Sequence, residues 1–352
     1  MESVEIKHYT VAQVRSWLEH NKEVDGLTNE VIRPAFAWAL VHNPDVLDTD
    51  PIVAAIYDNG NLAASTCAFP EIMVKPDFKD KKGNTKRIWW FPMLWVKKQY
   101  EGKGYGLVVI GSLAEVYGMD CAWTAWAVQE SIEIFEFLGC NTYYFPRYFM
   151  EEKQIRPISL KGKLAYFKQD IAKWWFNKRK PVLPSFDYSV RYLNNVDDLT
   201  YDFISSHEAN HFFHWSKNTH NWHLQYPWDI SAPLTERVPS DGEFVSKANS
   251  RTEHFLVQVW QEKQLVGVYV LRQNGKYMCI AEDSIYYENT HKDKVFASVV
   301  EHIKRLQITH FDTEDGELAQ FIQKYRYFPR CKTENISLSI SPEVSIPEHF
   351  IR

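Results

Sequence analysis

The stretch QYEGKGYGLVVIGSLAEVYG, residues 99–118, combines a glycine-rich turn with an apolar helical pattern. The turn contains three glycines, Gly102, Gly104 and Gly106, which alternate with a lysine and a tyrosine. Glycine has no Cβ atom, so the backbone of such a turn can come close to a ligand. The free amides of the first helical turn point toward that ligand, and the helix dipole adds about half a positive charge there. The stretch therefore predicts a phosphate-binding turn between a strand and a helix.

The residues around this turn predict the elements that hold it. RIWWFPMLWVKK, residues 87–98, has the aromatic and β-branched content of a strand, and the apolar spacing after the glycines predicts a helix over 105–117. Upstream, Asn59-Gly60 divides residues 51–74 into the two strands of a hairpin. Downstream, the expected elements are a strand at 121–128, a helix at 129–139 that ends at Gly139, and a strand at 141–150. This order predicts a mixed α/β fold.

The rest of the chain extends this pattern. Two N-terminal segments each begin with a threonine that can cap a helix, which predicts helices over 10–21 and 28–43. In the second half the same order of elements returns, which predicts a structural duplication although the residues do not repeat. Its expected helices are 199–215, 295–306 and 317–328, and its expected strands are 254–261, 265–273, 276–283 and 308–315.

A chain of 352 residues is longer than one compact domain usually is, so two domains are expected. Hydrophobic residues make up 45% and charged residues 24%, the balance of a protein with well-formed cores. Residues 151–180 contain nine basic and three acidic residues, with apolar residues at helical spacing, which predicts a basic amphipathic helix. We expect a first domain over 1–150, a connector over 151–185 and a second domain over 186–352.

Charge and cysteine content limit the partners and the compartment. A net charge of -5 provides no global field to attract nucleic acid, so none is expected as a partner. The five cysteines form no CxxC pair and are expected to be reduced thiols of a cytoplasmic protein. The N-terminal residues lack the apolar core of a signal peptide, and no apolar run is long enough for a membrane span. The basic helix either covers a domain edge or associates weakly with an anionic membrane surface.

The spacing of the glycines excludes two common phosphate motifs. A dinucleotide-binding turn needs GxGxxG, and Val109 occupies the third glycine position; the GxxxxGK[ST] pattern is also absent. GxGxG after a strand resembles instead the pyrophosphate loop of the GNAT acyltransferase superfamily. SIEIFEFLGC, residues 131–140, is similar to a later helix of that family. RYLNNVDDL (191–199) and NTHNWHLQYP (218–227) more loosely resemble the second domain of tandem proteins linked to bacterial surface-polysaccharide synthesis. The resemblance implies two GNAT-like domains, the second degenerate.

This resemblance implies acetyl-CoA as co-substrate. The backbone of Leu94, Trp95 and Val96 would bind the pantetheine arm, and Gly102, Lys103, Gly104, Tyr105 and Gly106 would surround the diphosphate. Glu101 begins this cofactor-binding loop, and its carboxylate would repel the phosphate unless it faces away. Three positions depart from the family pattern. Glu101 stands where the family has Arg or Gln, Phe135 stands where it commonly has the tyrosine that protonates the thiolate, and Val128 replaces a polar residue. The loop therefore supports cofactor binding more firmly than catalysis, and a plain glycine-rich turn is the alternative.

Acyl transfer to an amine needs a base and a route for protons. Glu71 is a candidate base acting through water, although a solvent-exposed carboxylate at a strand end is the simpler interpretation. Tyr143 or Tyr144 can replace the missing acid, but strand alternation directs only one of them inward. The indoles of Trp89, Trp123 and Trp126 are candidate surfaces for the acceptor, because aromatic rings stack on sugars as well as filling cores.

A competing motif lies at His207-Glu208-Ala209-Asn210-His211, which matches the HExxH pattern of zinc peptidases. The extended metzincin form of this motif has a third histidine ligand, and Lys217 occupies that position here. No metal is therefore expected. In the second half, SIYYENTHKDK (284–294) takes the place of the glycine loop and has two acidic residues and no glycine, so it is not expected to hold a diphosphate.

The favoured hypothesis is an N-acyltransferase that moves an acetyl or short acyl group from CoA to a small amine by direct attack, with an amino sugar as a candidate acceptor. The alternatives are an inactive binding protein of the same fold and a zinc hydrolase.

Overall fold

The structure is a computed structural model, and it describes residues 3–20, 24–72, 87–118, 122–123, 129–151, 183, 185–207, 215–225, 252–274, 276–280, 284–328 and 330–340. The described residues form two compact units. The first contains the chain up to Phe145, a helix near residue 220 and the residues from Ile336 onward. The second contains the remaining residues, from Pro146 through His207 and up to Asn335.

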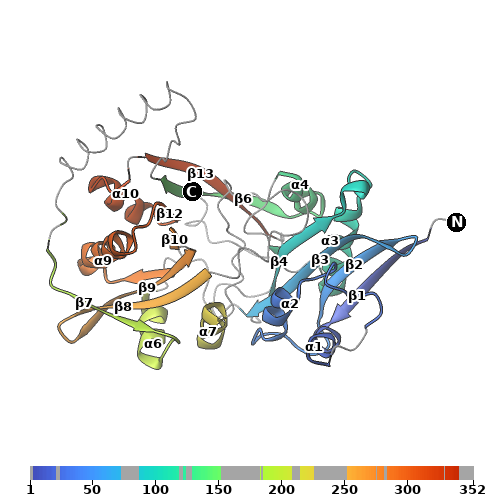
Figure 1. Cartoon of the computed structure of the whole chain (residues 1–352), viewed down its shortest axis with the longest axis horizontal. Helices are drawn as coiled ribbons and strands as arrows, with labels where there is room; N and C mark the ends of the chain where they lie inside the picture. The colour runs from blue at the N-terminus through green and yellow to red at the C-terminus, as the bar shows by residue number, and fades with distance from the viewer. Residues whose placement is uncertain are drawn as a thin grey trace, which may run out of the picture. The chain divides into compact units, whose positions relative to one another are not determined.

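The first unit is built on a five-stranded sheet in the order β1-β2-β3-β4-β5 (Figure 1). Its elements are β1 (Val4–Thr10), α1 (Val11–His20), α2 (Pro34–Val41), β2 (Pro51–Asp58), β3 (Asn61–Ile72), β4 (Arg87–Val96), a short 3-10 turn η1 (Lys98–Tyr100), α3 (Tyr105–Tyr117), β5 (Ala122–Trp123), α4 (Gln129–Phe137), the first part of β6 (Asn141–Glu151), and α7 (Lys217–Gln225). Strands β1 to β4 are antiparallel neighbours, and β5 runs parallel to β4. The mixed α/β class predicted from the sequence is therefore confirmed.

Local sequence signals explain where these elements begin and end. Thr10 and Gln13 form a capping box at the start of α1, in which each side chain bonds the other's backbone amide. Asn59 and Gly60 both have positive φ, as the tight hairpin turn between β2 and β3 requires. The predicted helix over 28–43 is wrong in its first half, because α2 begins only at Pro34. Proline disfavours the helical conformation of the preceding residue, which is extended here.

Strand β4 carries a bulge that divides it. Cys67 of β3 pairs with Met93, but Phe69 pairs with Trp90, so two residues of β4 oppose one residue of β3. One of these two is Pro92, which has no amide to donate and is tolerated at such an irregularity. The pairing with β5 extends over two rungs of the described residues, both of them before the bulge.

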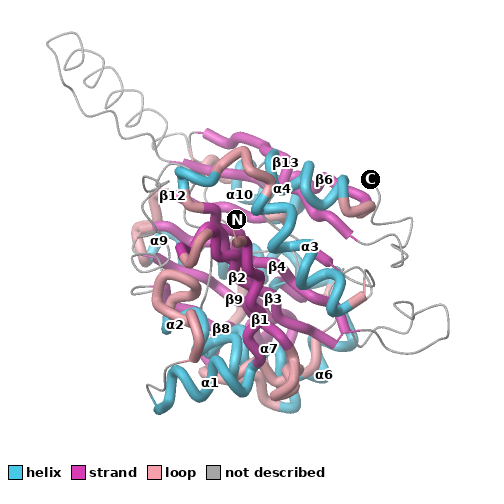
Figure 2. The backbone as a smooth tube through the Cα atoms, turned by 90° about the vertical axis from the view of Figure 1, so that its right-hand side faces the viewer, coloured by secondary structure: helices cyan, strands magenta, loops and turns pink. Residues whose placement is uncertain are grey.

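The two faces of β4 pack against different helices. On one face Trp89 stacks on Tyr117 of α3, with ring centroids 3.5 Å apart, and Phe91 contacts Phe135 of α4. On the other face Trp90 lies beside Phe69, which in turn contacts Trp222 of α7. The sheet therefore lies between α3 and α4 on one side and α7 on the other (Figure 2).

The second unit repeats this topology strand by strand. Its elements are the end of β6, β7 (Ser189–Leu193), α6 (Asp198–His207), β8 (Thr252–Gln261), β9 (Gln264–Asn274), β10 (Tyr277–Ile280), β11 (Ile285–Tyr287), a 3-10 turn η5 (Asn289–His291), α9 (Lys292–Arg305), β12 (His310–Thr313), α10 (Gly316–Lys324) and most of β13 (Arg330–Ile340). The sheet order β7-β8-β9-β10-β12 matches β1 to β5, and β12 is parallel to β10 as β5 is to β4. Strand β6 then pairs antiparallel with β12.

Each unit has its own apolar core of buried side chains. The four cysteines in the described part of the chain are free thiols. Among the described residues, no helix combines the length and the apolar character needed to cross a membrane.

Candidate functional site

The loop between β4 and α3 has the backbone shape of an anion-binding turn. Gly102 and Gly104 both have a φ of +78°, a left-handed conformation that favours glycine. Apart from the adjoining residues, no heavy atom of the described residues lies within 4 Å of the point where a Cβ would stand at either glycine. No described side chain therefore fills the space in front of these two glycines.

Several backbone amides of this loop donate no hydrogen bond within the described part of the chain: those of Gly102, Gly104, Gly106 and Leu107. The amide of Lys103 is different, because it donates to the carbonyl of Tyr100 over 3.3 Å. Gly104 is the N-cap of α3, so the unpaired amides lie at the positive end of the helix dipole. This arrangement suits a phosphate group.

Side chains of the loop form hydrogen bonds to the β2–β3 hairpin. The phenol of Tyr105 donates to a carboxylate oxygen of Asp58 over 2.9 Å, and Nζ of Lys103 lies 3.4 Å from the same oxygen. Asp58 itself is buried. Lys103 is thus directed to Asp58 at the hairpin, and Glu101 is exposed to solvent.

The third glycine lies where α3 begins to pack on its neighbours. A Cβ on Gly106 would stand 3.4 to 3.5 Å from side-chain atoms of Ile134, Leu94 and Val96. These are ordinary van der Waals distances, so the start of α3 packs on β4 and α4 here and a small side chain would also fit.

Strand β4 also offers backbone groups beyond its bulge. The Lys97 amide donates to the carbonyl of Ala63 on the β3 side, 2.9 Å away. Because the amides of a strand alternate in direction, those of Leu94 and Val96 point to the opposite edge. β3 pairs with β4 on one edge of these two residues, and no described strand pairs with them on the other. The glycine loop and this open edge therefore both present backbone donors in the described part of the chain.

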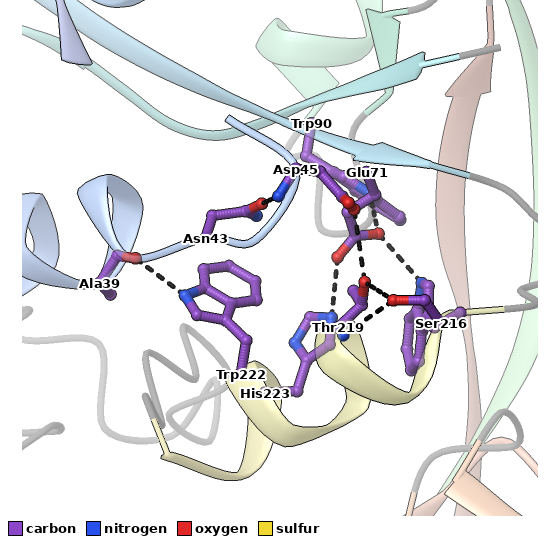
Figure 3. Close-up of polar contacts among 10 residues, drawn as sticks. Ala39, Asn43, Asp45, Glu71, Trp90, Ser216, Thr219, Trp222 and His223 are labelled. Atoms are coloured by element: carbon purple, nitrogen blue, oxygen red, sulfur yellow. Dashed lines mark hydrogen bonds and ion pairs between the residues drawn. The ribbon is translucent and has the colours of Figure 1, made fainter. Parts of the chain in front are cut away.

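A second polar cluster lies on the other face of the sheet (Figure 3). Glu71 of β3 is buried, with 1% of its surface exposed. One carboxylate oxygen accepts from the indole of Trp90 over 2.6 Å and from the indole of Trp215 over 3.0 Å. The other lies 2.7 Å from Nε2 of His223 on α7. The interpretation of Glu71 as a solvent-exposed strand-end carboxylate is therefore wrong.

Helix α7 is held in place by two further contacts, and a local hydrogen bond caps its start. The indole of Trp222 donates to the carbonyl of Ala39 in α2 over 2.9 Å. The hydroxyl of Thr219 donates to Asp45 over 3.3 Å, and the Ser216 hydroxyl accepts from the Thr219 amide at the start of the helix. In Figure 3, Ser216, Thr219 and His223 lie on the side of α7 that faces Glu71 and Asp45, and Trp222 points toward Ala39.

The other candidate residues have varied environments. Trp89 is buried under α3, and Phe135 is buried against Phe91, so both rings belong to the core. Tyr143 is half-buried, whereas Tyr144 is 53% exposed, as strand alternation requires. The backbone of Trp123 pairs with β4, and Trp126 lies outside the described residues.

Most of the HExxH motif lies outside the described residues as well. His207 closes α6, where its Nδ1 lies 2.8 Å from the carbonyl of Phe203. No group of three or more His, Cys, Asp or Glu side chains that could hold a metal occurs in the described ranges. The basic segment 152–182 is not described.

A bulged fourth strand with an open edge is joined by a glycine loop to a helix in this chain. The chain has the fold of the GCN5-related N-acetyltransferases, to which it is similar over nearly its whole length. No protein-family model matches the sequence, and no curated protein matches it.

Solved structures of this class are similar along nearly the whole chain. A conserved protein of unknown function from Enterococcus faecalis V583, a probable N-acyltransferase, is 11% identical with a TM-score of 0.53, over 96% of this chain and 72% of that one. A GCN5-related N-acetyltransferase from Anabaena variabilis is 7% identical with a TM-score of 0.52, over the same shares of the two chains. A glucosamine N-acetyltransferase region of a fungal multi-domain GH3 β-N-acetylglucosaminidase is 11% identical with a TM-score of 0.50, over 97% of this chain and 38% of that one. At these identities the likeness shows the fold.

Sequence reasoning missed His223 and the helix that carries it. Residues 217–225 read KNTHNWHLQ, which has no clear apolar stripe, and they lie more than 140 residues after Glu71. The available signal was the pair Trp222-His223 in an otherwise polar helix, because a large aromatic ring in such a helix usually packs against something.

Proposed function

We propose that the chain is an N-acyltransferase that takes an acetyl or short acyl group from CoA and transfers it to a small amine. The observation that carries this proposal is the row of unpaired amides at Gly102, Gly104 and Gly106. Amides fixed at a helix N-terminus suit the diphosphate of CoA, and the edge of β4 at Leu94 and Val96 suits the two amides of the pantetheine arm. The similarity in fold to N-acyltransferases supports the same function.

We propose an amino sugar as the acceptor. One of the similar folds is a glucosamine N-acetyltransferase region, and aromatic rings with one polar edge suit sugars. In this chain Trp90 and Trp215 lie beside His223 on one face of the sheet, where rings and polar groups lie close together.

Calorimetry with acetyl-CoA and with acetyl-pantetheine tests the site. We expect acetyl-CoA to bind at micromolar concentration and acetyl-pantetheine, which lacks the diphosphate, to bind at least about 100-fold more weakly, because charge-assisted hydrogen bonds contribute about 1.5–3 kcal/mol each. Equal affinities would show that the loop does not bind the diphosphate. Thiol release from acetyl-CoA in the presence of glucosamine and a panel of other amines then tests transfer.

An inactive binding protein is the second candidate, favoured by one observation. Phe135 is 1% exposed and packs on Phe91, so α4 places no hydroxyl at the position where the family commonly has an acid. This alternative predicts tight binding of acetyl-CoA without thiol release for any amine of the panel, whereas an enzyme releases thiol with at least one of them.

A further inference from the structure

The donors around Glu71 determine which nitrogen of His223 carries a proton. Indole N–H groups can only donate, so the oxygen that receives Trp90 and Trp215 acts as a double acceptor, as in an ionised carboxylate. The other oxygen is 2.7 Å from Nε2 of His223. An ionised carboxylate accepts only, so Nε2 carries the proton and Nδ1 is the basic nitrogen of the neutral ring.

Burial separates the roles of the two side chains. The Glu71 side chain is 1% exposed, and both its oxygens are occupied by donors, so it cannot meet an acceptor molecule directly. The His223 side chain is 19% exposed. The imidazole is therefore the member of the pair that can reach a ligand, and Glu71 fixes its orientation and tautomer.

The register of the sheet places this pair beside the expected reaction centre. Glu71 pairs with Ile88, and its partner Trp90 is the last residue of β4 before the bulge. A pantetheine arm that starts at the glycine loop and follows the open edge back along β4 passes Val96 and Leu94 and brings its sulfur toward the bulge. The thioester would then arrive at the end of β4 where the indole of Trp90 contacts Glu71.

We propose that His223, positioned by Glu71, is the proton acceptor for the attacking amine; this inference rests on the proposed function. The neutral amine nitrogen attacks the thioester carbonyl and forms the new C–N bond. Nδ1 of His223 takes the proton from that nitrogen, and the C–S bond breaks with its electron pair moving to sulfur. The imidazolium then returns the proton to the thiolate, directly or through water, so that CoA leaves as the thiol and the amide is neutral.

Groups from three elements set the charge around the imidazole. Glu71 faces it from β3. On α7 itself, His220 contacts Trp215, which also stacks near His223. From the loop after α2, Asp45 contacts the helix through Thr219. The two carboxylates favour an imidazolium once the proton has been transferred, and a protonated His220 would oppose it.

The test compares His223→Ala and Glu71→Gln with Trp222→Phe, which removes a docking hydrogen bond of α7 but leaves the dyad in place. With acetyl-CoA and the amine of the panel that wild type uses best, we expect His223→Ala to lower kcat about 100-fold without changing the affinity for acetyl-CoA. Added imidazole restores part of that rate, a response that loss of packing alone does not give. Glu71→Gln lowers kcat about 10-fold and changes the acid side of the pH–rate profile, and Trp222→Phe stays within about threefold of wild type.

The outcomes separate this inference from the proposed function. Transfer by wild type with a His223→Ala rate above one third of it overturns the role of His223 alone. An equal loss in Trp222→Phe, or a loss in His223→Ala without imidazole rescue, assigns the effect to docking of α7 and also overturns it. Absence of acetyl-CoA binding, or of thiol release with every amine, overturns the acyltransferase proposal itself. Nitrogen NMR of labelled histidine adds a readout that needs no turnover, because a proton on Nδ1 of His223 at neutral pH would contradict the assigned tautomer.

Discussion

The two units contain the same strand order but differ at the turn that precedes α3 in the first unit and α9 in the second. In the first unit, Gly102 and Gly104 leave an open notch in front of α3. In the second, the corresponding turn before α9 holds side chains: Tyr287 and Lys292 both bond Glu317, and Glu288 bonds Gln264. A topology that repeats therefore does not by itself make an anion site, and the glycines make the difference.

The two units also differ in strand pairing near these turns. In the described residues, β4 pairs with β5 over two rungs, whereas all four residues of β10 pair with β12. In the second sheet, Asp312 of β12 forms a buried ion pair with Arg147 of β6, and Tyr277 of β10 donates to that same carboxylate. Among the described strands, β11 pairs with β9 alone, so an open strand edge does not separate the two units, and the glycine turn is the reason to propose ligand binding in the first.

The largest effect is expected from replacing the N-cap glycine of α3. Gly104→Val forces a β-branched residue into a left-handed conformation and fills the notch, so we expect acetyl-CoA to bind about 100-fold more weakly. The matched control is Gly139→Val, which has a φ of +86° and equally open space but lies at the end of α4. Both variants lose about 1–2 kcal/mol of stability, and only Gly104→Val loses affinity in calorimetry. Equal affinity losses would show that general destabilisation explains the effect.

Much of this difference between the units can be predicted from the sequence, and there are physical reasons why the rest cannot. The glycine spacing, the Asn59-Gly60 hairpin and the helix over 105–117 depend on local conformational preferences, which a short window contains. The late start of α2 also has a local cause, because Pro34 disfavours a helical conformation of the residue before it. The contact of His223 with Glu71 is different, because it depends on tertiary packing between segments far apart in the chain. Bulges such as the one near Pro92 also depend on pairing with a neighbour, so the open edge of β4 could not be derived from β4 alone.

A smaller effect is expected from loosening the glycine loop. Tyr105→Phe removes the hydrogen bond to Asp58 that anchors the loop, so we expect a threefold to tenfold loss of acetyl-CoA affinity, about 1 kcal/mol. Tyr287→Phe is the equivalent change in the second unit, where it removes a hydrogen bond to Glu317. Calorimetry should show unchanged affinity for Tyr287→Phe. A comparable loss there would mean that the second unit also contributes to binding.

Acid sensitivity should be greater in the second unit. Burial lowers the pKa of His302, which is 4% exposed and bonded to Tyr269. Below about pH 6.5 the unfolded chain therefore binds a proton that the folded state resists, and stability falls with decreasing pH by at most about 1.4 kcal/mol per unit. In urea unfolding at pH 5.0 and 7.5, His302→Gln should reduce this difference. His8→Gln should change it less, because His8 is largely exposed although burial also lowers its pKa. Equal pH dependence in wild type and His302→Gln would contradict this assignment.

We expect no change in acetyl-CoA binding when the acidic charges at the turn before α9 are removed. If carboxylates alone kept a phosphate away from that turn, removing them in Glu288→Gln with Asp293→Asn would create a second site, because the N-terminus of α9 has its own dipole. We expect instead one acetyl-CoA per chain before and after the change. The backbone there has no glycine to admit a phosphate, and the Glu288 amide already donates to Val266. A second equivalent of bound acetyl-CoA in the calorimeter would show that charge, and not backbone shape, distinguishes the two units.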